Sequence, residues 1–63
     1  MYRPHAEAIA ATILRLDADR AAGRITRGSY RTRLLGALAR AEARGCLDDV
    51  HALVTVDRRA VAA

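Results

Sequence analysis

The fold is decided by one stretch of sequence, AGRITRGSY at residues 22–30. Gly23 can adopt the left-handed conformation that ends a helix. The hydroxyl of Thr26 can cap the exposed amide groups of a helix that starts after it. Ile25 precedes this cap and is expected to pack against Tyr30, which occupies the fourth position of the new helix. The stretch therefore predicts a sharp hinge between two helices.

Upstream of the hinge, the sequence predicts a first helix from about residue 4 to residue 22. Pro4 suits the first helical position, where its missing N–H removes no hydrogen bond. Ile9, Ile13 and Leu16 recur at helical spacing and give this segment one apolar stripe. We expect the stripe to face the second helix.

Downstream of the hinge, a second helix is predicted over residues 27–44 and ends at Gly45. A shorter third helix is predicted over residues 47–54, with Val50, Leu53 and Val54 on its apolar face. The β-branched residues 54–56 are too few to build a sheet. The prediction is an all-α, three-helix domain over residues 1–56, a long hairpin with a short helix packed across it, followed by a frayed tail at 57–63. The predicted core is Ile9, Ile13, Leu16, Ile25, Tyr30, Leu34, Leu38, Val50 and Leu53.

Residues 10–54 resemble the short helical-hairpin domains of the SHOCT type, and in particular an actinobacterial SHOCT-like domain of unknown function. The resemblance is carried by Gly23, Ile25, Thr26 and Tyr30 at the hinge, by Arg33-Leu34 and Ala37-Leu38 in the second helix, and by Asp49-Val50 and Leu53-Val54 in the third. Where such domains carry acidic residues after the cap, this sequence has Arg27, Gly28 and Ser29. The resemblance implies an interaction or oligomerisation role and no catalytic residues.

The composition restricts how so short a chain is stabilised and where it works. A chain of 63 residues buries only about 60% of the surface that its unfolded form exposes. The single cysteine allows no internal disulfide, and with two histidines it makes no four-ligand metal site, so no cofactor or metal is expected. A partner or a second copy is the stabiliser that is left. No apolar run approaches the ~18 residues of a membrane span, and a cytoplasmic location is expected.

All 11 basic residues are arginine, and the net charge is +4. Arginine- and alanine-rich composition is typical of GC-rich genomes and suggests a small regulatory factor of an actinobacterium or its phage. Seven arginines fall within residues 20–44 against one acid, Glu42. Arg33, Arg40 and Arg44 share one flank of the predicted second helix, where they can contact an acidic protein partner. A solvated face that keeps the chain soluble is the alternative.

A small DNA-binding regulator is the second functional alternative. Arg24, Arg27 and Arg31 would contact phosphates near the start of the second helix. In a helix-turn-helix arrangement, this second helix suits DNA recognition better than the third, which begins with Asp48 and Asp49 and would be repelled by phosphate. Binding to phosphates should weaken strongly with salt.

A side of small residues on the second helix predicts a protein-binding surface. It consists of Thr32, Gly36, Ala39 and Ala43 and is bordered by Leu35. Leu14, which falls off the main stripe of the first helix, is assigned to the same surface, together with Arg31, Arg33, Arg40 and Arg44. Such a face suits self-association or a partner helix. Scattered surface residues in an alanine-rich chain are the alternative.

No catalytic constellation is evident in the sequence. Cys46 and His51 are five positions apart, so they do not share one helical face, and no third group is placed to orient them. Cys46 is predicted to be a partly buried cap residue. The sequence thus predicts a non-enzymatic protein–protein interaction or oligomerisation module, with DNA binding as the alternative.

Overall fold

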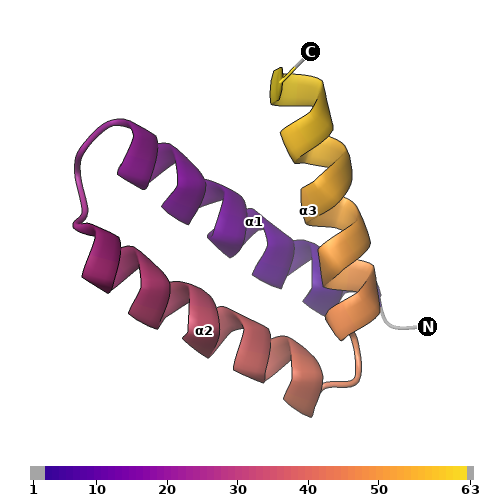
Figure 1. Ribbon diagram of the computed structural model, residues 1–63. Coiled ribbons are helices and arrows are strands. Elements are labelled where there is room, and N and C mark those ends of the chain that lie inside the picture. Colours follow the sequence, from indigo (N-terminus) through magenta and orange to yellow (C-terminus); the bar gives the residue numbers. More distant parts are fainter. Residues whose placement is uncertain (1–2, 63) are drawn as a thin grey trace.

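The computed structural model describes residues 3–62, and this part of the chain forms three helices: α1 (Arg3–Ala21), α2 (Arg27–Ala43) and α3 (Leu47–Ala62). Figure 1 shows α1 and α2 as an antiparallel hairpin, with α3 crossing beside the N-terminal half of α1. The all-α, three-helix prediction is confirmed. Residues 1–2 and 63, which the predicted domain and tail included, lie outside the described residues.

The hinge between α1 and α2 is formed by the residues that predicted it. Gly23 has φ +74°, and its N–H donates to the carbonyl of Arg20, while the N–H of Arg24 donates to the carbonyl of Asp19. These two bonds satisfy carbonyls that the end of a helix leaves without partners. Thr26 then caps α2, because its Oγ1 accepts a hydrogen bond from the N–H of Ser29 at 3.1 Å. The chain therefore reverses direction within a few residues.

The turn between α2 and α3 repeats this geometry. Gly45 has φ +69°, its N–H donates to the carbonyl of Glu42, and the N–H of Cys46 donates to the carbonyl of Ala41. Helix ends of this kind commonly carry an apolar contact between the residue after the glycine and a residue of the last helical turn. Here these two residues are Cys46 and Ala41, and both are buried in the core. The carbonyl of Cys46 then accepts the first bond of α3, from the N–H of Val50.

Alanines make up much of the core. Ile9, Ile13, Leu16 and Val50 are buried as predicted, and six further buried residues were absent from the predicted core: Ala6, Ala10, Ala37, Ala41, Cys46 and Val54. Of these, Val54 was predicted on the apolar face of the third helix and Cys46 was predicted to be partly buried. The predicted core residues Leu34, Leu38 and Leu53 are partly buried against this cluster. Ile25 and Tyr30 are half-buried and do not belong to it, because they lie at the hinge end of the hairpin.

The third helix is longer than predicted. It continues to Ala62, so the expected fraying of 57–63 is wrong for the residues that the structure describes. Two physical reasons extend it: Val54 is buried, and Arg58 forms an ion pair with Asp17 on α1. The segment also contains no glycine or proline to stop it. The C-terminal part of the described chain therefore belongs to the third helix and packs beside α1.

The molecule is open for its size. Its radius of gyration is 11.7 Å, against about 10.6 Å for a compact chain of this length. Its accessible surface is 4695 Å², against about 4,000 Å² for a compact monomer of the same mass. The excess arises because α3 packs mainly on α1 and hardly touches α2. Several helix faces therefore stay uncovered, and they carry the candidate sites.

Candidate functional site

The side of α2 that points away from the core is an exposed surface of mostly small residues. Thr32, Gly36, Ala39 and Ala43 are all exposed, and no atom outside the helix lies within 4 Å of a Cβ built at Gly36. Leu35 borders these residues and is 55% exposed. We call this surface the Leu35 face. The residues that the sequence assigned to it on α2 do lie together on the outside of the molecule.

Exposed arginines line both flanks of the Leu35 face. Arg33, Arg40 and Arg44 share one flank by their helical spacing, and Arg27 and Arg31 share the other. Within residues 3–62, none of these five side chains takes part in an ion pair. Their charges are therefore available to an external carboxylate or phosphate.

Arg24 differs from the other arginines of the predicted cluster. Its Nε lies 2.9 Å from Oδ1 of Asp19, so the guanidinium is held at the hinge. Arg15 lies four positions before Asp19, a helical spacing that would allow an ion pair, but this pair is not formed. Of the three arginines in the nucleic-acid alternative, Arg27 and Arg31 are without an ion-pair partner among the described residues.

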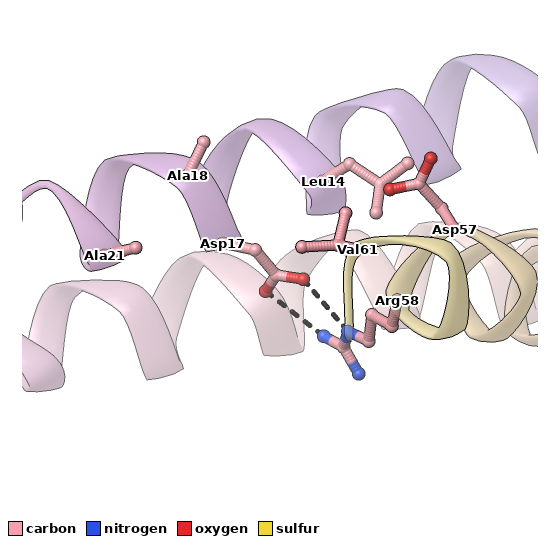
Figure 2. Close-up of a pocket in the computed structure, with 7 residues that line it drawn as sticks. All are labelled: Leu14, Asp17, Ala18, Ala21, Asp57, Arg58 and Val61. Atoms are coloured by element: carbon pink, nitrogen blue, oxygen red, sulfur yellow. Dashed lines mark hydrogen bonds and ion pairs between the residues drawn. The ribbon is translucent and has the colours of Figure 1, made fainter. Parts of the chain in front are cut away.

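Leu14 lies on a different surface from Leu35. It is half-buried, packs against the core and faces the space between α1 and α3. Figure 2 shows its side chain near Val61 of α3, with Ala18 and Ala21 farther along α1. The assignment of Leu14 and Leu35 to one surface is therefore corrected: the structure contains two separate surfaces.

Leu14 lies between two adjoining, mainly apolar hollows that together form a groove between α1 and α3. The groove consists of two hollows of about 430 and 540 Å³, and both are lined by Leu14 and Asp57. We call this surface the α1–α3 groove. Its other lining residues are Glu7, Ala10, Ala11, Asp17, Ala18 and Ala21 from α1 and Leu53, Val56, Arg58, Ala60 and Val61 from α3. Sequence patterns did not indicate this groove, because α3 was expected to end before it.

One polar cluster ties the three helices together at the edge of the groove. The Arg58 guanidinium binds both carboxylate oxygens of Asp17, with Nε at 2.9 Å from Oδ2 and Nη2 at 3.1 Å from Oδ1 (Figure 2). The Tyr30 hydroxyl donates to Oδ1 of the same carboxylate at 2.5 Å. The Arg20 guanidinium lies 5.4 Å from the centre of the Tyr30 ring, within cation–π distance.

The cluster shifts the pKa values of its own members. Burial raises the pKa of Asp17, but the hydrogen bonds from Arg58 and Tyr30 and the charge of Arg58 outweigh it, and the pKa is lowered overall. The hydrogen bond to Asp17, with burial and the charge of that carboxylate, raises the pKa of Tyr30. The same carboxylate raises the pKa of Arg58, chiefly through its hydrogen bond. These shifts indicate that the cluster favours ionised Asp17 and neutral Tyr30, an arrangement that stabilises structure.

The residues considered for catalysis are not assembled into a site. Cys46 is 7% exposed, whereas His51 is exposed on α3. No group of three or more His, Cys, Asp and Glu side chains capable of holding a metal occurs within residues 3–62. Over the same residues, no helix is long and apolar enough to cross a membrane. The features that distinguish the described surface are the Leu35 face with its arginines and the α1–α3 groove.

Comparison of the chain with protein-family models, with curated proteins and with solved structures gives no match.

Proposed function

We propose that this chain is a small, non-enzymatic protein–protein interaction or oligomerisation module, and that the Leu35 face is its principal contact surface. One observation carries the proposal: an apolar side chain that is 55% exposed lies between two rows of arginines that no acidic side chain within residues 3–62 neutralises. Leu35 supplies apolar area, and the small neighbouring residues let a partner backbone approach closely. The arginines select a partner with carboxylates along both edges of its contact surface.

A protein partner is favoured over DNA by the state of the arginines and by the shape of the face. Arg24 is engaged by Asp19, which leaves Arg27 and Arg31 of the group that would contact phosphates. A DNA-reading helix needs long polar side chains toward the bases. The outer side of α2 presents alanine, glycine, threonine and leucine instead, including Ala39 and Gly36.

The resemblance of the hinge to SHOCT-type hairpins supports the same class of function, because those domains act through interaction or oligomerisation. The arginine- and alanine-rich composition supports a source in an actinobacterium or its phage, where the module would serve as a regulatory factor. The free thiol of Cys46 suits the reducing cytoplasm.

The proposal is tested by affinity capture from lysate of the cells that encode the chain, with and without nuclease treatment. The informative variant reverses charge on one flank, Arg40→Glu with Arg44→Glu. The matched control, Arg15→Glu with Arg59→Glu, changes the net charge equally on exposed parts of α1 and α3. We expect capture of a protein partner that resists nuclease treatment. The amount captured should fall at least tenfold with the first variant and stay unchanged with the second.

Two results contradict the proposal. Capture that disappears with nuclease and falls by orders of magnitude between 50 and 200 mM salt indicates nucleic-acid binding. Equal loss in both charge-reversed variants indicates that net charge alone attracts the captured protein and that the Leu35 face is not a specific site.

A further inference from the structure

The α1–α3 groove is an apolar surface that the folded chain leaves unfilled. Along one side of α3, Val54 is 6% exposed where α1 covers it, but Val61, two turns later, is 81% exposed. Val56 on the groove's edge is 69% exposed. Because α1 and α3 diverge toward their C-terminal ends (Figure 1), α1 no longer covers the side of α3 on which Val54 and Val61 lie. The apolar side of α3 thus extends beyond the helix that covers it.

The charges around the groove are acidic, in contrast to the rest of the molecule. Asp17 and Arg58 neutralise each other at its edge. Glu7 and Asp57 also line the groove, and neither forms an ion pair with another side chain of residues 4–61. Two grooves facing each other across a twofold axis would bring these carboxylates together, and the one cation of the described lining, Arg58, is already paired with Asp17, so this contact is unfavourable. The preferred occupant is therefore an apolar surface flanked by basic side chains.

The Leu35 face has the required chemistry. Leu35 is the one large apolar side chain on α2 that is highly exposed, and it has arginines on both sides. We propose that the α1–α3 groove of one copy binds the Leu35 face of a second copy, with Leu35 beside Leu14 and the flanking arginines near Glu7 and Asp57. This inference rests on the proposed function, because it names the partner of the same face.

This contact joins two different surfaces and is therefore head-to-tail. Each copy retains one unused groove and one unused Leu35 face after the first contact forms. Such an interface adds further copies until a ring closes or a filament grows. It also covers surface on both sides of the open molecule.

The experiment is sedimentation velocity with variants that block one surface each. Leu35→Glu removes the apolar side chain of the face, and Ala18→Arg fills the groove from an exposed position on α1 and repels the incoming arginines. Ala8→Glu and Ala52→Arg make the same charge changes at exposed positions that line neither surface. Circular dichroism checks that every variant keeps its helices.

We expect the average mass of the unaltered chain, and of both control variants, to rise with concentration beyond that of a dimer. Leu35→Glu and Ala18→Arg should each be monomeric. An equimolar mixture of these two should form a dimer and nothing larger, because one intact groove meets one intact face and both outer surfaces are blocked.

Three results overturn the inference. The first result is an unaltered chain that stays monomeric up to millimolar concentration. The second result is that Leu35→Glu or Ala18→Arg still assembles by itself. The third result is an equimolar mixture of the two variants that stays monomeric, which would show that the contact is symmetric and needs both surfaces in each copy. If self-association fails while the capture of another protein still depends on Arg40 and Arg44, the proposed function stands and the second copy is the wrong partner.

Discussion

Asp17 is the residue at which the three helices are joined. Its carboxylate on α1 accepts from Tyr30 on α2 and from Arg58 on α3. The Arg58 side chain is 52% exposed, so solvent screens the ion pair, and we assign it about 0.2–1 kcal/mol. The hydrogen bond from the Tyr30 hydroxyl adds about 1 kcal/mol. Together these are a large fraction of the stability of so small a domain.

The pH dependence of folding should reveal this cluster. Because the pKa of Asp17 is lowered, its contribution is present above the unfolded value of about 3.9 and is lost as pH falls through the folded pKa. Because the pKa of Tyr30 is raised, its contribution is present below about pH 10 and is lost as pH rises through the folded pKa. Thermal unfolding of the unaltered chain and of Asp17→Asn should therefore differ most between about pH 5 and pH 9, converge at low pH, and differ less at high pH, where the Asp17–Arg58 ion pair remains.

Tyr30→Phe is the control for the alkaline side of this profile. It removes the alkaline decline and keeps the acidic one, since the Asp17–Arg58 pair stays in place. A melting-temperature difference between Asp17→Asn and the unaltered chain that is constant from pH 2 to pH 11 would contradict the assignment.

The buried alanines set the distance between helices. Ala37 is 0% exposed, and Ala6 on α1 is equally buried, so neither position has space for a larger side chain. We predict that Ala37→Leu destabilises the fold by about 1–3 kcal/mol through overpacking. Ala8→Leu, at an exposed position on α1, should stay within about 0.5 kcal/mol. Urea unfolding of both variants measures the difference, and equal stabilities would show that the hairpin tolerates a wider spacing.

At the scale of the elements, local signals predicted α1 and α2 almost to the residue. Gly23, Thr26 and Gly45 act within one turn of their own positions, so their effect can be read from neighbouring sequence. The end of α3 depends on Arg58 contacting Asp17, which is 41 residues away, and no local pattern reports such a contact. The residues of the Leu35 face were found from helical spacing, whereas the α1–α3 groove required the path of α3.

The alanine core was missed for a related reason. Ala37 and Ala41 share a helical face with Leu34 and Leu38, but alanines occur on every face of these helices, so alanine at such a position does not by itself indicate burial. Leu14 was misplaced because its spacing shows only that it lies off the main stripe. Which helix covers that second side is a property of the tertiary structure.

Shortening the chain tests whether the last turns of α3 stabilise the molecule. Truncation after Val56 removes Arg58 and Val61 and leaves Asp17 without its ion-pair partner. We expect the melting temperature to fall by about 5 °C, as a loss of about 1 kcal/mol, the upper end of the range for this ion pair, implies for a domain of this size. Truncation after Val61 keeps the ion pair and should melt within about 2 °C of the full chain. Equal melting of the two truncated chains would mean that the segment after Val56 contributes nothing.

At the scale of the whole molecule, an open three-helix chain without a disulfide gains stability when copies associate. Binding that requires the folded state raises the melting temperature with concentration. We predict that a hundredfold increase in concentration raises the melting temperature of the unaltered chain, while Leu35→Glu melts at a constant temperature. Differential scanning calorimetry at both concentrations is the measurement. If the melting temperature of both chains is independent of concentration, self-association does not stabilise the folded chain, and the prediction is wrong.

Because Cys46 is buried, the reactivity of its thiol measures how often α3 moves away from the hairpin. The side chain is 7% exposed at the junction of α2 and α3, so a thiol reagent reaches it when this junction opens. The rate of alkylation in the folded protein therefore reports how often the third helix detaches from the hairpin. Because the chain has one cysteine, the modified fraction read by mass spectrometry gives that opening rate or equilibrium without any engineered label.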